Sequence, residues 1–137
     1  MSQIKKIGVL TGGGDCPGLN AVIRGVTKTA INQYGASVIG FMDGFKGLVL
    51  NHYMDLDLRA VSGIGHTGGT ILGTTNRDNP FHFMMDENVN EFSDESDRAI
   101  ENLRKLEVDG LIVIGGDGSL HIAQNFYQKG VKVVGVP

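Results

Sequence analysis

The residues of this sequence best suited to phosphate chemistry are Gly115–Ser119, which follow the apolar run Leu111–Ile114. Glycines let backbone N–H groups approach a polyphosphate closely, and a helix N-terminus adds the positive end of its dipole. Asp117 can hold Mg²⁺, because this ion takes few protein ligands when substrate phosphates supply the other oxygens. The segment predicts a phosphate loop, and the alternative is a glycine-rich turn between a strand and a helix that Asp117 caps.

A second glycine cluster, Thr11–Asn20, occupies the same kind of position between a predicted strand and a predicted helix. It has neither the Gly-Lys-Ser/Thr ending of a Walker A loop nor the Gly-x-Gly-x-x-Gly of a dinucleotide fingerprint. Its place at the carboxyl edge of a sheet nevertheless suits a nucleotide phosphate. The alternative is a tight turn with Asp15 as a helix cap.

Four short apolar runs predict the strands that position these loops. Their cores are nearly continuous rather than alternating, which is typical of parallel strands that are covered on both faces. The predicted strands are Lys6–Thr11, Ser37–Met42, Leu111–Gly115 and Lys132–Val136.

Helical spacing occurs between the predicted strands. Apolar residues recur at i, i+3, i+4, i+7 and i+11 from Leu19 to Ala30, with Pro17 near the helix entry and Gly35 just past its end. A second helix is expected to begin with Ser93 as its cap. Alternating strands and helices predict an α/β fold, a Rossmann-like three-layer sandwich with a mostly parallel sheet.

The third helix is expected to begin around Ser119 or Leu120 and to end before Gly130. Residues 43–92 fit the alternating scheme poorly. Within them, Asp43–Gly47 is interpreted as a turn, followed by a short strand near Leu48–Leu50. A long stretch without clear structure is unusual in a compact domain and is often functional.

The bulk composition is that of one ordinary globular domain of 137 residues, with 41% hydrophobic and 20% charged residues. A net charge of -3 gives no support for a nucleic-acid or membrane surface. No apolar run approaches the ~20 residues that span a bilayer. The single cysteine, Cys16, excludes an internal disulfide framework and is interpreted as a small packing residue. These features predict a cytoplasmic protein.

Three segments together resemble the N-terminal signatures of the 6-phosphofructokinases, in the order and spacing of that family. They are Gly13–Ala21, Gly68–Thr74 and Gly115–Ser119. Gly-Gly-Asp-Gly alone also marks NAD kinases and diacylglycerol kinases, so the combination is what identifies the family. The resemblance covers the whole chain, which amounts to less than half of a family member. Residues 1–137 are therefore expected to be an incomplete phosphofructokinase, an N-terminal ATP-binding domain without the C-terminal substrate domain.

The resemblance also implies site residues. Gly14 resembles the glycine whose backbone meets the ATP phosphates, and Asp117 resembles the aspartate linked to Mg²⁺. The ATP-binding loop is matched by Gly116, Asp117, Gly118 and Ser119. Arg77 resembles a catalytic arginine that approaches ATP and the transferred phosphoryl group, although its spacing from Gly73 is shifted by one residue from many relatives. The alternative for Arg77 is a solvated loop arginine.

The implied activity is transfer of the γ-phosphoryl group of MgATP to the 1-hydroxyl of fructose 6-phosphate, in glycolysis. In the family, glycine at the position of Gly118 goes with ATP, whereas pyrophosphate-using relatives carry an aspartate there. The family places its general base in a Thr-Ile-Asp-Asn-Asp motif shortly after the position of Pro137, so the isolated chain is expected to be inactive. The longer parent is expected to form a homo-oligomer, a tetramer or dimer, with ATP and fructose 6-phosphate as its small-molecule partners.

Several alternatives stay open. They are a pyrophosphate-dependent phosphofructokinase, another Gly-Gly-Asp-Gly kinase such as an NAD kinase, and a nucleotide-binding module without catalysis. The resemblance places phosphate-binding arginines of the bacterial effector site at the positions of Arg24, Lys28 and His52. Effector control of this type is not expected here, because lysine cannot reproduce a bidentate phosphate contact. The four histidines show no metal-ligand spacing.

Overall fold

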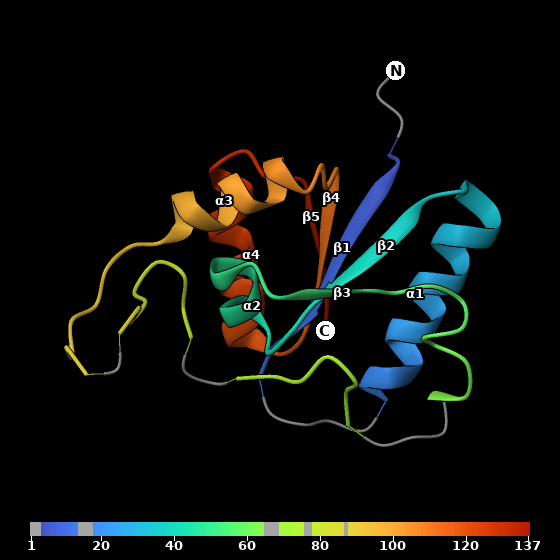
Figure 1. Ribbon diagram of the computed structural model, residues 1–137, viewed down its shortest axis with the longest axis horizontal. Helices are drawn as coiled ribbons and strands as arrows, with labels where there is room; N and C mark the ends of the chain where they lie inside the picture. Colours follow the sequence, from blue (N-terminus) through green and yellow to red (C-terminus); the bar gives the residue numbers. More distant parts are fainter. Residues whose placement is uncertain (1–3, 14–17, 65–68, 76–77, 87) are drawn as a thin grey trace.

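The structure is a computed structural model that describes residues 4–13, 18–64, 69–75, 78–86 and 88–137. Its centre is a five-stranded sheet with the strand order β3-β2-β1-β4-β5 (Figure 1). Strands β1, β2, β4 and β5 are parallel, and the edge strand β3 runs antiparallel to β2. The strands are β1 (Lys6–Thr11), β2 (Ser37–Phe41), β3 (Tyr53–Asp55), β4 (Gly110–Ile114) and β5 (Val133–Val136).

The helices form two layers around this sheet, so the predicted α/β three-layer sandwich is confirmed. Helix α1 lies on one face, and α2, α3 and α4 lie on the other (Figure 1). The helices are α1 (Leu19–Tyr34), α2 (Phe45–Leu50), α3 (Ser96–Lys105) and α4 (Asp117–Gln128). Helix α4 begins at Asp117, two or three residues earlier than the sequence predicts.

Each central strand buries side chains on both faces of the sheet. In β1, Val9 packs in the core on the α1 side, whereas Leu10 packs in the core beneath α2, α3 and α4, and both are fully buried. The same division separates Val38 from Ile39 in β2. Continuous apolar runs are the result, because successive side chains of a strand point to opposite faces.

Helix α1 ends where the sequence predicts. Gly35 adopts the left-handed conformation with φ 64°, and its backbone N–H is directed at the carbonyl groups of Ala30 and Ile31. Glycine occupies this conformation without the steric penalty that a Cβ atom brings, so it ends the helix cleanly.

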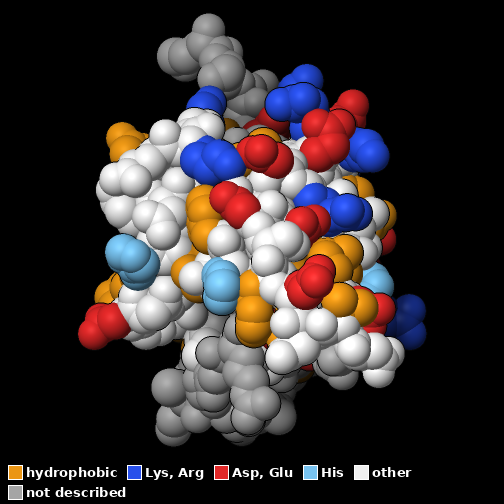
Figure 2. Space-filling model, turned by 90° about the vertical axis from the view of Figure 1, so that its left-hand side faces the viewer, with side chains coloured by type: hydrophobic (Ala, Val, Ile, Leu, Met, Phe, Trp, Pro, Cys, Tyr) orange, Lys and Arg blue, Asp and Glu red, His pale blue; other side chains and the backbone are white. Residues whose placement is uncertain are grey.

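The charged side chains on the face that carries the three helices are mixed in sign. Figure 2 shows Lys and Arg interspersed with Asp and Glu over the upper part of this face, rather than gathered in a patch of one sign. Among the described residues, ion pairs join side chains of opposite charge at Arg98–Glu95, Arg104–Glu101 and Lys129–Asp97. In the described part of the chain, no helix is long and apolar enough to cross a membrane.

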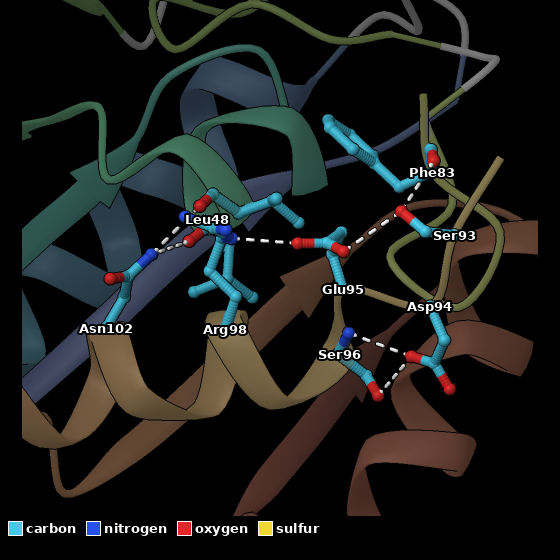
Figure 3. Close-up of polar contacts among 9 residues, drawn as sticks. Leu48, Phe83, Ser93, Asp94, Glu95, Ser96, Arg98 and Asn102 are labelled. Atoms are coloured by element: carbon cyan, nitrogen blue, oxygen red, sulfur yellow. Dashed lines mark hydrogen bonds and ion pairs between the residues drawn. The ribbon is translucent and has the colours of Figure 1, made fainter. Parts of the chain in front are cut away.

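The turn predicted for Asp43–Gly47 is confirmed only at Asp43 and Gly44, because α2 begins at Phe45. The short strand predicted near Leu48–Leu50 is wrong, because those residues belong to α2. Gly47 lies inside the helix, where a Cβ atom would come within 2.7 Å of the His52 carbonyl oxygen. The short helix is completed from α3, since the Asn102 side-chain amide donates to the carbonyl oxygens of Leu48 at 2.8 Å and Val49 at 3.0 Å (Figure 3). Contacts distant in sequence therefore override the local turn signal.

Ser93 does not cap α3, which corrects the sequence prediction. The Asp94 carboxylate instead accepts hydrogen bonds from the Ser96 N–H at 2.9 Å and the Ser96 hydroxyl at 2.6 Å (Figure 3). These two bonds lower the pKa of Asp94 below its usual value. Arg98 and then Ser93 lower the pKa of Glu95 by hydrogen bonding to its carboxylate.

Replacing Asp94 with alanine should lower the free energy of unfolding by about 1 kcal/mol at neutral pH, because the first residue of α3 loses its hydrogen-bond acceptor. A carboxyl whose pKa is lowered on folding stabilises the chain fully above its unfolded value, here 3.8. The difference between wild type and Asp94→Ala should then vanish as the pH falls through the lowered pKa. Urea denaturation along an acid series measures both effects.

The control is Glu91→Ala. Glu91 is exposed and makes no hydrogen bond or ion pair within the described residues. An equal loss of stability in both variants would contradict the assignment of Asp94 as the start signal of α3.

Candidate functional site

An open pocket of about 440 Å³ lies at the carboxyl edge of the sheet, where β1 and β4 end. It is formed by the loop after β1, the start of α2, the first turns of α4 and the residues Thr75, Asp78 and Asn79. Within the described chain its lining residues are Gly13, Phe45, Thr75, Asp78, Asn79, Gly116, Asp117, Gly118, Ser119, His121 and Ile122.

Two glycines bring the β1 and β4 loops into direct contact. Thr11 and Ile114 are register partners, and the Gly12 N–H donates to the Ile114 carbonyl oxygen at 2.9 Å. A Cβ atom on Gly12 would overlap the Ser119 hydroxyl, and one on Gly115 would lie 2.7 Å from the Gly12 carbonyl oxygen. These glycines are therefore needed for packing between the loops.

Two other glycines leave space for a ligand. A Cβ atom on Gly116 or Gly118 would meet nothing within 4 Å, and both residues line the pocket. Because the first N–H groups of a helix have no acceptor within the helix, the start of α4 offers donors and a positive dipole end to an anion. The site thus combines free volume with backbone donors.

Asp117 is the first residue of α4 and is exposed, whereas the N-cap is Gly116 in an extended conformation without a side-chain capping bond. The alternative of Asp117 as the cap of its own helix is therefore wrong. Asp78 and Asn79 line the same pocket. No group of three or more histidine, cysteine or acidic residues in the described chain could hold a metal alone. One or two carboxylates suffice for Mg²⁺ when phosphate oxygens complete its shell, so this donor set fits the ion.

Part of the pocket lining is apolar. Phe45, at the start of α2, is 4% exposed, and its ring stacks on Phe126 of α4 with centroids 6.1 Å apart. Ile122 and His121 add a second turn of α4 to the same wall. A flat ring system could lie against this surface while its charged groups face the glycine loops.

The structure brings together four of the predicted site residues, Gly116, Asp117, Gly118 and Ser119, in one pocket. Gly14 and Arg77, the other two, lie outside the described residues. Sequence reasoning missed Phe45, Thr75, Asp78, Asn79, His121 and Ile122. The periodicity of α4 offered a signal for His121 and Ile122, because they follow the loop on the same helix, but nothing local marks Phe45.

A family model described as Phosphofructokinase matches residues 6–137. The chain belongs to the phosphofructokinase family. It is 55% identical to ATP-dependent 6-phosphofructokinase 2 of Clostridium perfringens, over 100% of this chain and 38% of that protein. It is 45% identical to a pyrophosphate–fructose 6-phosphate 1-phosphotransferase of Dictyoglomus thermophilum, over 100% of this chain and 36% of the relative. The chain thus spans less than half the length of these phosphofructokinase relatives.

Solved phosphofructokinase structures share the fold. The crystal structure of Pichia pastoris phosphofructokinase in the T-state superposes with a TM-score of 0.79 at 32% identity, covering 94% of this chain and 14% of the other. A pyrophosphate-dependent phosphofructokinase from Nitrosospira multiformis shows the same fold, with a TM-score of 0.75 at 21% identity, covering 97% of this chain and 33% of the other.

The two kinds of glycine should respond oppositely to alanine. Gly12→Ala should lower the free energy of unfolding by about 1–3 kcal/mol, because the added methyl group collides with Ser119. Gly118→Ala should raise it by up to about 1 kcal/mol, because the methyl group meets open space and alanine favours the helix. Urea denaturation of the ligand-free chain measures both. Equal effects of the two substitutions would show that the loops are not in contact as described.

Proposed function

We propose that this chain is the nucleotide-binding part of an ATP-dependent 6-phosphofructokinase. The parent reaction would transfer the γ-phosphoryl group of MgATP to the 1-hydroxyl of fructose 6-phosphate. The observation that carries the proposal is the meeting of the β1 loop, the segment ending at Thr75 and the start of α4 around one pocket. The ATP-dependent relative from Clostridium perfringens, identical at 55% of positions, supports the same activity.

In this proposal the phosphates of ATP lie against the backbone of Gly13 and the first turn of α4. The N–H groups there are suited to anions, and Gly116 and Gly118 have no side chains to displace the ligand. Asp117 would hold Mg²⁺, with Asp78 as the second carboxylate of the pocket. When bound, the ion would neutralise phosphate charge and orient the transferred group. The adenine ring would lie against Phe45 and Ile122.

The resemblance to the 6-phosphofructokinases also implies roles for Gly14 and Arg77, which are part of this proposal. Gly14 would offer its backbone to the phosphates, and Arg77 would stabilise the charge of the transferred phosphoryl group. Thr75 and Asp78, which flank Arg77 in the sequence, line the pocket and support this role. The parent protein would be a cytoplasmic homo-oligomer, a tetramer or dimer, that acts in glycolysis.

Pyrophosphate is the second candidate donor, because the Dictyoglomus thermophilum relative is named for it. Gly118 favours ATP, since an aspartate at this place would add bulk and negative charge to the phosphate end of the pocket. The apolar wall made by Phe45 and Ile122 also favours a donor with a base, because pyrophosphate has nothing to bury there.

Changing Gly118 to aspartate should raise the Kd for MgATP by about tenfold or more, equivalent to about 1.4 kcal/mol. The main reason is charge repulsion, because a Cβ atom at this position would meet nothing within 4 Å. The matched control is Gly118→Asn, which adds nearly the same volume without the charge and should weaken binding much less. Isothermal titration calorimetry with MgATP and with magnesium pyrophosphate measures the effect. Wild-type binding of pyrophosphate but not ATP would reverse the donor assignment.

The activity itself is tested on the full-length parent that contains these residues. It should release ADP from MgATP only when fructose 6-phosphate is present, as followed by a coupled ADP assay. NAD offered in place of the sugar phosphate is the control acceptor for the NAD kinase alternative. Phosphorylation of NAD without phosphorylation of fructose 6-phosphate would overturn the proposal.

A further inference from the structure

The segment 69–75, which overlaps the Gly68–Thr74 motif and ends at Thr75 in the pocket lining, is held at the end of β1 by side-chain hydroxyls. Thr11, the last residue of β1, is fully buried. Its Oγ1 lies 3.0 Å from the Thr70 Oγ1 and 3.0 Å from the Gly73 carbonyl oxygen. The Thr70 Oγ1 in turn accepts the Leu72 N–H at 3.2 Å. Neither threonine is among the residues that line the pocket.

The chemistry of these groups gives the hydrogen-bond chain one direction. A carbonyl oxygen only accepts, so the single hydroxyl proton of Thr11 is donated to Gly73. The contact between the two hydroxyls then requires Thr70 to donate to Thr11. The Thr70 oxygen keeps a lone pair for the Leu72 N–H. Each hydroxyl therefore donates once and accepts once, so every polar group in this partly buried series of hydrogen bonds is satisfied.

Other contacts attach the segment without replacing this chain. The Asn20 side-chain oxygen accepts the Ile71 N–H at 2.7 Å, and the Asp43 N–H donates to the Leu72 carbonyl oxygen at 2.8 Å. The Leu72 side chain is fully buried on the α1 side of the sheet, beside Gly40. Apolar burial of Leu72 supplies much of the docking energy but has no direction, whereas hydrogen bonds to defined atoms select one register.

We propose that Thr11 and Thr70 are positioning residues for the nucleotide pocket. The backbone of Thr11 leads through one residue to Gly13, which forms one wall, while its side chain fixes Gly73, which leads to Thr75 on another wall. One buried side chain thus sets the relative position of two walls before the ligand arrives. Such preorganisation raises affinity, because the free-energy cost of ordering the site is met on folding and does not oppose ligand binding. The inference rests on the proposed nucleotide site.

The test compares variants that keep the shape of the side chain and change its hydroxyl. Thr70→Val removes the central hydroxyl and should weaken MgATP binding about fivefold, the effect of roughly one hydrogen bond. Thr70→Ser keeps the hydroxyl and should bind nearly as wild type. Thr11→Val should weaken binding at least as much, because the Gly73 carbonyl oxygen loses its donor. Calorimetric Kd values are measured under conditions where urea titrations show each variant to be folded.

A core variant separates positioning from general stability. Ile39→Val removes a methylene group from the core on the opposite face of the sheet from Leu72, and it should destabilise the chain without changing the Kd. If Thr70→Val binds MgATP as tightly as wild type, or if Ile39→Val weakens binding as much as Thr70→Val does, the positioning role is overturned.

Amide hydrogen exchange of the ligand-free chain gives a readout that does not depend on the nucleotide. Exchange of the Leu72 N–H, followed by NMR, should be faster in Thr70→Val and restored in Thr70→Ser, because this N–H donates to the Thr70 hydroxyl. If wild type does not bind MgATP, the proposed function fails. Faster exchange of the Leu72 N–H in Thr70→Val would still support the role of Thr11 and Thr70 in positioning the segment 69–75. Unchanged exchange would overturn it whatever the ligand.

Discussion

Parallel pairing of β1 with β4 is the constraint on which the site depends. The two strands end together, with Thr11 opposite Ile114, so the loops that follow leave the sheet side by side. Gly12 then donates to Ile114 and packs against Ser119, and no larger residue fits between them. The abundance of glycine at this edge therefore meets two demands. Some glycines allow the loops to touch each other, and others keep the pocket open.

Much of the fold could be predicted from the sequence, because the signals were local and agreed with one another. The strand at Lys6–Thr11 has the predicted bounds, and Gly35 ends α1 through a conformation that favours glycine. Helix α2 could not be predicted in this way. It is six residues long and contains Gly47. The carbonyl oxygens of Leu48 and Val49 accept hydrogen bonds from Asn102 of α3, a helix that is distant in the sequence. Short helices depend on tertiary contacts more than on propensity.

The candidate site was predictable only in part, for the same reason. Gly116–Ser119 were found because their order within five residues has a chemical meaning. Phe45 joins them through the packing of α2 on α4, and no spacing in the sequence reveals that contact. The start of α3 illustrates the limit at a smaller scale. Ser93 and Asp94 are both acceptable caps by residue type, but the N-cap position is Glu95, and it is the Asp94 carboxylate that accepts the hydrogen bonds of Ser96.

The pairing of β1 with β4 also has a consequence for the order of folding. The unit β1–α1–β2 is contiguous in the sequence, whereas β1 and β4 are joined by a connection of about one hundred residues. Closing so long a connection costs conformational entropy before the contacts between the two strands can form. We therefore expect the unit β1–α1–β2 to form early and the pocket to appear with the last pairing. A ligand that bridges Gly13 and Gly116 would act as a clamp on that late step, so occupancy of the pocket would slow global unfolding.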